Sequence, residues 1–335
     1  MSKTKQIFVV GSSRSGTTMM GRILGNNKDI FTFNELHFFG TIWTNTSNQE
    51  LSKLEQINLL SRLFCIEENG LFRQESIADF NDKAKALLSD NIKNPLEVYA
   101  LFLNKITLEN SASISCEQTP KNMYYLEEIL SYFPNAMAIN LVRDQRDVLL
   151  SQKNKWKRKF LGASAIPLSE SIRSFVNYHP LLMSKVWASS LQHTKKYKNH
   201  NRVKIVKFEE LVSNSEETIK KVCSFLEIEF QEEMLSIPVI GSSTEADSKL
   251  SHIDSSKVNK WKNGGLTNSE IYLSQKMSAD MLQEFGYDLK KFFSPPLLSV
   301  YYLAIFPVKL LLAFMLNFHR MTNVVDVIKK RFFVK

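Results

Sequence analysis

Residues 11–20, GSSRSGTTMM, combine two glycines, small hydroxyl side chains and one arginine. A glycine-containing turn before a helix presents free backbone N–H groups and the positive end of the helix dipole to an anion. Arginine adds a planar, permanently charged donor, and threonine hydroxyls add further donors. This pattern indicates a loop that binds a phosphate or sulfate group. The residues expected to contact the anion are Ser13, Arg14, Ser15, Gly16, Thr17 and Thr18.

The loop departs from an ATP-binding loop at one position. In G-x-x-x-x-G-K-[ST] a lysine follows the second glycine and reaches the terminal phosphates, whereas this chain has Thr17 there. Because two spaced glycines are a weak signal alone, a strand-to-helix turn without a ligand is the structural alternative. A nucleotide kinase or NTPase is the functional alternative.

A second candidate lies in residues 139–152, INLVRDQRDVLLSQ. Arg143 stands at the end of an apolar strand, and Ser151 lies two turns into the expected next helix. Their side chains can therefore converge on one group. The structural alternative for RDQRD is a solvated turn with ion pairs.

Strand-like and helical patterns alternate along the chain, which predicts an α/β fold. The arrangement is a P-loop-like three-layer fold with a central parallel sheet of about five strands flanked by helices. Region 40–110 reads as a helical insertion and 230–265 as a loop. The expected strands are Ile7–Val10, Ile30–Phe33, Ser113–Cys116, Ala136–Val142 and Val203–Phe208. The expected helices are Thr17–Asn26, Leu51–Phe64, Leu96–Leu108, Met123–Tyr132, Arg146–Trp156, Leu168–Tyr197, Ser215–Leu226 and Glu270–Phe285.

Both motifs, in this order, resemble the sulfotransferases, especially their carbohydrate, protein-tyrosine and bacterial branches. The loop resembles the family's 5′-phosphosulfate loop, and the second motif resembles its 3′-phosphate site. The resemblance covers most of residues 6–290 and implies the co-substrate 3′-phosphoadenosine-5′-phosphosulfate (PAPS), without a metal. It assigns Arg143 and Ser151 to the 3′-phosphate. It also places Lys260, in SSKVNKWKNGG, in a loop that closes over the nucleotide.

Sulfuryl transfer also needs a base for the acceptor hydroxyl. Residues 31–43, FTFNELHFFGTIW, supply Glu35 and His37 just after the second expected strand. The resemblance to the protein-tyrosine branch favours Glu35, while a histidine serves in other branches. The structural alternatives are a first-turn helix residue for Glu35 and a half-buried loop residue for His37.

Two positions depart from the family pattern. Gln118, in CEQTPKN, stands where relatives often have a lysine that stabilises the transferring group, and Lys121 is a candidate substitute. Phe208 stands where many relatives have tyrosine. The first departure leaves open a non-catalytic, membrane-associated nucleotide-binding protein.

The net charge of +9 is concentrated in two segments, because residues 143–159 and 300–335 each carry a net charge of +5. This indicates local anion-facing patches and argues against nucleic-acid binding. The segment 294–318 is apolar except for Lys309, and Pro307 and Lys309 interrupt this apolar stretch. An interfacial hairpin or amphipathic anchor is favoured over a bilayer span, with a helix packed on the body or against a dimer partner as the alternative.

The sequence therefore predicts a PAPS-dependent sulfotransferase domain in residues 1–290, with an apolar and basic extension in 291–335. The expected acceptor is a hydroxyl on a saccharide or glycolipid. The N-terminus does not read as a signal peptide, and the three cysteines are separated in the chain. These features favour a cytoplasmic protein, peripheral at the inner membrane face.

Overall fold

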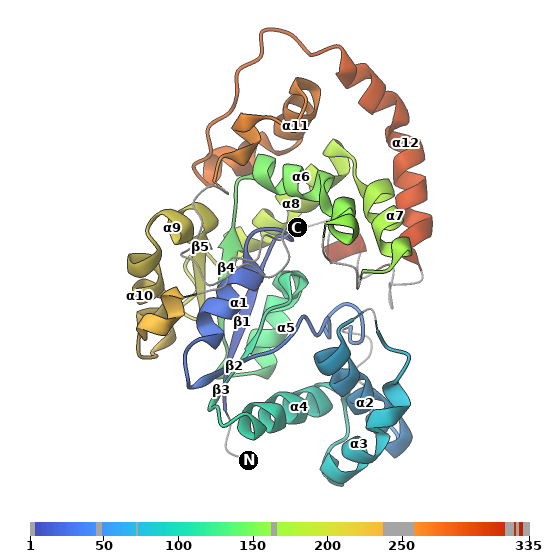
Figure 1. Cartoon of the computed structure of the whole chain (residues 1–335), viewed down its shortest axis with the longest axis vertical. Helices are drawn as coiled ribbons and strands as arrows, with labels where there is room; N and C mark the ends of the chain where they lie inside the picture. Colours follow the sequence, from blue (N-terminus) through green and yellow to red (C-terminus); the bar gives the residue numbers. More distant parts are fainter. Residues whose placement is uncertain are drawn as a thin grey trace.

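The computed structural model describes residues 4–44, 49–71, 73–161, 166–236, 258–318, 325 and 328–330. At its centre, five parallel strands form one sheet in the order β2-β3-β1-β4-β5 (Figure 1). Helices flank this sheet, so the predicted α/β fold with a parallel sheet is confirmed. The strands are β1 Lys5–Gly11, β2 Ile30–Thr32, β3 Ile114–Glu117, β4 Met137–Val142 and β5 Val203–Lys207.

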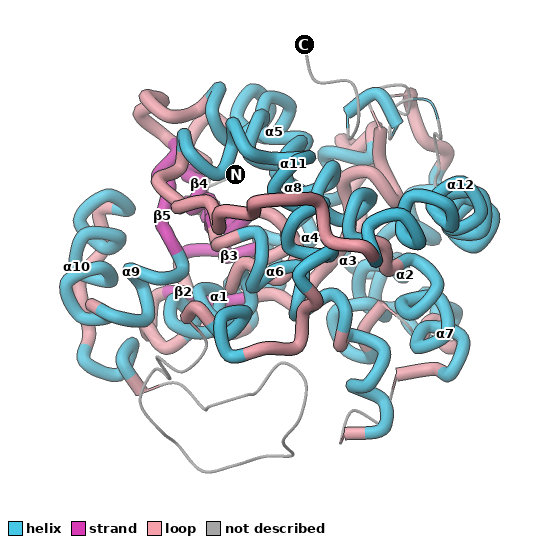
Figure 2. Tube along the Cα trace, turned by 90° about the horizontal axis from the view of Figure 1, so that it is seen from above, coloured by secondary structure: helices cyan, strands magenta, loops and turns pink. Residues whose placement is uncertain are grey.

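The helices lie on both faces of the sheet and at its ends (Figures 1 and 2). The α-helices are α1 Thr17–Gly25, α2 Lys53–Asn69, α3 Asn81–Leu87, α4 Pro95–Glu109, α5 Leu126–Tyr132, α6 Gln145–Lys153, α7 Leu168–Asn177, α8 Pro180–Lys196, α9 Phe208–Ser213, α10 Ser215–Leu226, α11 Asn268–Glu284 and α12 Leu298–Asn317. The short 3-10 helices are η2 Ile77–Phe80, η3 Pro120–Tyr125, η4 Lys155–Phe160, η5 Glu232–Leu235 and η7 Lys260–Asn263.

The central strand β1 is covered on both faces. Ile7 and Val9 join a core cluster with residues of α1 and α10, while Phe8 and Val10 join a cluster with residues of α2, α4 and α5. Because successive strand residues point to opposite faces, a strand covered on both sides is apolar at every position. This accounts for the unbroken apolar run before the glycine-containing loop.

The predicted helix Leu168–Tyr197 is wrong as a single element, because it is divided into α7 and α8. The break falls at His179, which has extended backbone angles directly before Pro180. Proline disfavours helical geometry in the preceding residue and lacks the N–H that a continuous helix would use. Pro180 instead occupies the first turn of α8, where that N–H is not needed.

The basic helix predicted over Arg146–Trp156 also ends early. The α-helix α6 stops at Lys153, and the chain continues as the 3-10 helix η4. Tightening from 3.6 to about 3 residues per turn changes the directions of the following side chains. As a result, the basic residues of η4 do not continue the face of α6.

The C-terminal apolar segment is helical, as expected, and forms one helix, α12. Pro307 lies inside this helix without ending it, so the hairpin is wrong as a description of the segment. Pro307 removes one backbone donor, but it is exposed, and the rest of α12 is rich in leucine and alanine, which have high helix propensity. Helix α12 lies beside α7 on the outer side of the molecule (Figures 1 and 2). Most of the expected loop at 230–265 falls on residues 237–257, which lie outside the described residues.

Candidate active site

The loop between β1 and α1 has the sharp backbone of an anion-binding turn. Arg14 and Gly16 have positive φ angles of 75° and 98°, and the N–H of Ser15 donates to the carbonyl of Ser12 at 3.1 Å. Gly16 is also required by packing, because a Cβ there would lie 2.6 Å from the ring of Phe208. The predicted loop is therefore shaped from both sides, by its own turn and by the chain after β5.

The N-terminus of α1 offers donors to a ligand. Thr17 and Thr18 are its first two residues, Thr17 buried and Thr18 exposed, and its first turn has no acidic residue. Ser13 is half-buried beside them, whereas Ser15 is fully buried. The Ser15 hydroxyl finds no hydrogen-bond partner within the described part of the chain. Such an orphaned donor beside a helix N-terminus fits an anionic ligand.

Three predicted residues from distant segments meet at this loop. The Nε of Arg14 donates to the hydroxyl of Ser151 at 2.9 Å, and Arg143 Nη1 donates to the backbone carbonyl of Arg14 at 3.3 Å. Burial, followed by the positive charges of Arg158 and Arg143, lowers the pKa of Arg14 to about 10. The arginine remains charged at neutral pH, but its surroundings favour an added anion.

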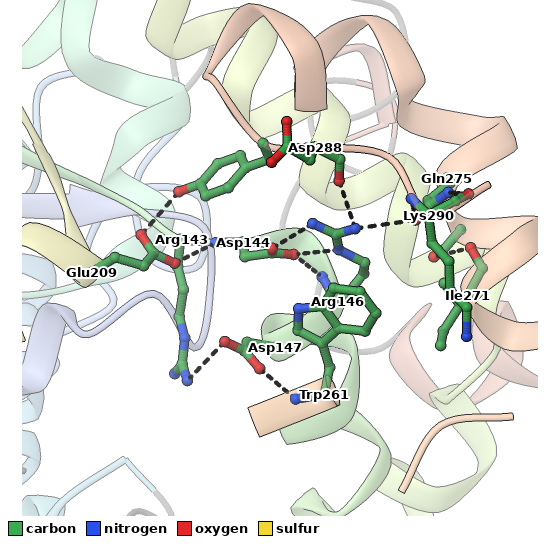
Figure 3. Close-up of polar contacts among 12 residues, drawn as sticks. Arg143, Asp144, Arg146, Asp147, Glu209, Trp261, Ile271, Gln275, Asp288 and Lys290 are labelled. Atoms are coloured by element: carbon green, nitrogen blue, oxygen red, sulfur yellow. Dashed lines mark hydrogen bonds and ion pairs between the residues drawn. The ribbon is translucent and has the colours of Figure 1, made fainter. Parts of the chain in front are cut away.

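Arg143 is held by groups from several elements at the end of β4. Its guanidinium lies over the ring of Phe208, 4.1 Å from the ring centre, and its backbone carbonyl accepts from the indole N–H of Trp187 at 3.0 Å. Asp147 Oδ2 lies 3.9 Å from Arg143 Nη2 (Figure 3). The phenylalanine that departs from the family pattern thus provides a cation–π contact in place of a hydroxyl.

Asp147 also joins this arginine to the predicted closing loop. Its Oδ1 accepts from the backbone N–H of Trp261 at 2.9 Å, and the Trp261 ring packs 4.0 Å from the guanidinium of Arg146 (Figure 3). Arg146 in turn bonds to both carboxylate oxygens of Asp144. The neighbouring Lys260 is exposed, so its predicted contact with a phosphate stays a prediction.

Glu35 and His37 form a close pair just beyond β2. Glu35 Oε2 lies 3.1 Å from His37 Nε2, and His37 adopts a positive φ of 51°. Burial alone would raise the pKa of Glu35, but the hydrogen bond and charge of His37, with the charges of Lys155 and Lys121, lower it overall. Burial is the main cause of the lowered pKa of His37, against the raising effect of Glu35. Near neutral pH an ionised Glu35 therefore accepts a hydrogen bond from neutral His37.

A buried carboxylate holds this pair in place. Glu117, at the end of β3, accepts from the backbone N–H of Leu36 at 3.3 Å and from the side chains of Thr119 and Asn122. The Thr119 hydroxyl accepts from the backbone N–H of His37 at 3.2 Å. The CEQTPKN stretch thus positions the Glu35–His37 pair, a role that sequence reasoning missed.

Lys155 is the other residue that the sequence prediction missed. It lies in η4, and burial, followed by the charges of Arg14 and Arg173, lowers its pKa to about 8, while Glu35 opposes this shift. The one feature of the sequence that pointed to Lys155 was the positive charge of segment 143–159, which predicted an anion-facing patch. Gln118, in contrast, packs against the Gly21 region of α1. Lys155 is therefore better placed than Gln118 to supply positive charge near Glu35.

Together, the ends of β1, β2 and β4 present a paired carboxylate, a glycine-containing loop and several cations at one edge of a parallel sheet. This edge is where ligands bind in such folds. Among the residues that the structure describes, no group of three or more His, Cys, Asp or Glu residues could hold a metal ion.

Comparison with known proteins agrees with this arrangement. The family model described as "Sulfotransferase family" matches residues 6–232, so the chain belongs to the sulfotransferase family. The sulfotransferase domain of the curacin biosynthetic pathway has a similar fold, with a TM-score of 0.53, 21% identity, and coverage of 85% of this chain and 98% of that domain. The sulfotransferase domain of the Synechococcus PCC 7002 olefin synthase gives a TM-score of 0.54 at 18% identity, covering 87% and 98%.

A curated relative is an uncharacterized protein of Aquifex aeolicus strain VF5. It is 25% identical over 234 residues, which make up 69% of this chain. The matched region spans 26% of that relative's length, or about a quarter.

Proposed function

We propose that the protein transfers a sulfuryl group from PAPS to a hydroxyl of a saccharide or glycolipid acceptor. The observation that carries this proposal is the meeting of Arg14, Arg143 and Ser151 at the N-terminus of α1, beside the Glu35–His37 pair. A sulfotransferase needs this combination: a site for two phosphate groups and, next to it, a base for the acceptor.

On the nucleotide side, the residues fit a phosphosulfate with a second phosphate. The α1 N-terminus, the orphaned Ser15 hydroxyl and Arg14 suit the 5′-phosphosulfate. Arg143 and Ser151 suit the 3′-phosphate, with Lys260 as a candidate from the closing loop. Arginine is suited to both groups because its planar fork matches phosphate and sulfate oxygens.

In the proposed reaction, Glu35 accepts the proton of the acceptor hydroxyl as its oxygen attacks sulfur. The new oxygen–sulfur bond forms as the bond between sulfur and the 5′-phosphate oxygen breaks. The electron pair of that bond remains on adenosine 3′,5′-bisphosphate, whose growing negative charge Arg14 and Lys155 stabilise. Neutral His37 orients Glu35 by donating its Nε2–H, and no metal ion enters these steps.

The acceptor side is shaped partly by the helices that follow β2. The backbone N–H of Asn34 donates to the Glu67 carboxylate of α2 at 3.0 Å, which ties this helix to the loop carrying Glu35. Helices α2–α4 therefore limit the space from which an acceptor approaches, and they are where we look for its specificity.

Two measurements test the proposal. Calorimetry should show tighter binding of adenosine 3′,5′-bisphosphate than of ADP or ATP; the reverse order would favour the nucleotide kinase or NTPase alternative. Transfer of radiolabelled sulfate from PAPS to a cell lysate should be lost in Glu35→Ala. Bisphosphate binding without transfer by the wild type would favour the non-catalytic alternative.

A further inference from the structure

Helix α12 exposes a nearly continuous apolar surface. It is the helix among the described residues that is long and apolar enough to cross a membrane, with a mean hydropathy of 1.9 over its most apolar window. Ser299 and Ala313 are its buried residues. The large side chains exposed along it are Leu298, Val300, Tyr301, Leu303, Val308, Leu310, Leu311, Leu312, Phe314 and Met315.

The lysine and the asparagine of α12 reach towards α7 instead of away from the protein. Lys309 Nζ reaches the carbonyls of Phe175 and Val176 at the end of α7, at 3.5 and 3.4 Å. Asn317 accepts from Arg173 at 2.9 Å. A surface helix of a water-soluble protein has the opposite arrangement, with its apolar stripe inward and its charges outward. The outward face of α12 is therefore suited to an apolar environment.

Helix α7 extends the same surface. Leu168, Ile172 and Phe175 are spaced by four and three residues, so they share one face, and each is more than half exposed. Phe175 contacts Lys309 on one side and Trp156 of η4 on the other, with ring centres of the aromatic pair 5.8 Å apart. The apolar surface thus continues from α12 over α7 to the helix η4 that carries Lys155.

The segments next to this surface in the chain carry exposed cations and few acidic residues. Residues 151–169 and 289–325 contain no aspartate or glutamate. Lys157 is exposed on η4, and Lys291 is exposed just before α12. Helix α7 has one acidic residue, Glu170, and Arg173 pairs with it at 2.5 Å. Basic segments next to an apolar face complement lipids with negatively charged headgroups.

We propose that α12 and α7 together form a docking surface for an anionic bilayer, with α12 lying in the plane of the membrane. The apolar side chains enter the headgroup–acyl boundary, and the basic residues remain at headgroup level. A transmembrane position would break the inward contacts of Lys309 and Asn317 and expose both to hydrocarbon, so in-plane docking is favoured. In a symmetric dimer, the basic segments of two copies would face each other without acidic partners. A second copy of the chain is therefore a poorer match for this surface than an anionic bilayer.

The test is sedimentation of the full chain with vesicles of phosphatidylcholine alone or mixed with phosphatidylglycerol. The wild type should bind the anionic vesicles and lose binding as salt increases. The triple substitution Val308→Ser, Leu311→Ser and Met315→Ser should weaken partitioning at least about tenfold. The matched control is Leu54→Ser with Leu108→Ser, which removes equally exposed leucines from α2 and α4 and should bind as the wild type does.

Binding of adenosine 3′,5′-bisphosphate by each variant verifies that the chain is folded, and it does not depend on the membrane. Vesicle binding unaffected by the triple substitution would overturn the proposal. So would a wild-type dimer that ignores vesicles and becomes monomeric in the triple variant. Vesicle-bound wild type that resists extraction by alkaline carbonate would also overturn it, because that result indicates a spanning helix.

Discussion

The two halves that we propose for the candidate site, a nucleotide side and an acceptor side, differ in how firmly their charges are held. On the nucleotide side, Arg143 has a ring beneath it and Asp147 beside it, and Asp147 is bonded to Trp261 (Figure 3). On the acceptor side, Glu35 has the 3.1 Å contact with His37, and its side chain is 38% exposed. The arginine of the first half is fixed by several contacts, whereas the carboxylate of the second is set in from the surface but remains partly accessible.

The halves differ in electrostatic balance as well. Carboxylates accompany the arginines of the nucleotide side, but near Glu35 the cations outnumber the acids. Lys155, and Arg14 where the nucleotide side adjoins Glu35, have lowered pKa values, about 8 and about 10, because of burial and neighbouring positive charge. An excess of buried positive charge costs stability in the free protein and is relieved when an anion binds. This balance is consistent with the proposed reaction, in which negative charge develops near these cations.

The largest expected effect follows from removing the base. Glu35→Gln preserves the shape of the side chain but cannot accept the acceptor proton, so kcat should fall by about 10²–10⁴-fold. Affinity for adenosine 3′,5′-bisphosphate should change by less than about twofold, because the nucleotide half is intact. Steady-state sulfate transfer and calorimetry measure the two quantities. A loss of less than tenfold in kcat would remove Glu35 from the role of base.

The reverse pattern is expected from Arg143→Met. Losing a charge-assisted contact with the 3′-phosphate should weaken bisphosphate binding by about 10–150-fold. ADP, which lacks that phosphate, should lose much less, and kcat at saturating PAPS should be largely retained. Calorimetry with both nucleotides checks this. Equal losses for the two ligands would show that Arg143 supports the loop as a whole instead of reading the 3′-phosphate.

Lys155 predicts a pH dependence. Its pKa is lowered to about 8, so its charged form is present below that pH and is lost as pH rises through it. The kcat/KM for PAPS, which reports the free enzyme, should therefore decrease above pH 8, by up to about tenfold per pH unit. Lys155→Arg keeps the charge, so the decrease in kcat/KM should begin at a higher pH in this variant. If the decrease begins at the same pH as in the wild type, a group other than Lys155 causes it.

The positions of Arg143 and Ser151 were easier to predict from the sequence than the position of Lys155 near Glu35. Arg143 and Ser151 follow a strand with a helical spacing, so local geometry alone directs both to one edge of the sheet. The role of Lys155 was not predicted because it belongs to a run of basic residues, each of which is expected to be exposed to solvent. Its direction depends on the change from α6 to the 3-10 helix η4, and no periodicity in the sequence marks that change.

Glu117 was missed for a related reason. A glutamate at the end of a strand reads equally well as a ligand-binding or a structural residue. Its four donors are the backbone N–H of Leu36, the backbone N–H and hydroxyl of Thr119, and the side-chain amide of Asn122 in η3. The break between α7 and α8 could have been read from Pro180. The inverted polarity of α12 could not, because it depends on which neighbour Lys309 and Asn317 meet.

The smallest effect is expected at Phe208, the residue that touches both the phosphate loop and the 3′-phosphate side. Its ring fills the space that Gly16 leaves and supports the guanidinium of Arg143 at 4.1 Å. Phe208→Leu should weaken bisphosphate binding by about two- to fivefold, because the cation–π contact is lost while leucine still fills part of the buried space. Phe208→Tyr keeps the ring and should bind within about twofold of the wild type.

Calorimetry of Arg143→Met with and without Phe208→Leu decides whether the two residues act together. If the ring acts through the guanidinium, the second substitution should add almost nothing once Arg143 is gone. If the ring instead acts by shaping the loop around Gly16, the two losses should add in free energy. Additive losses would show that Phe208 supports the loop and not Arg143. The phosphate loop and Arg143 would then contribute to binding independently.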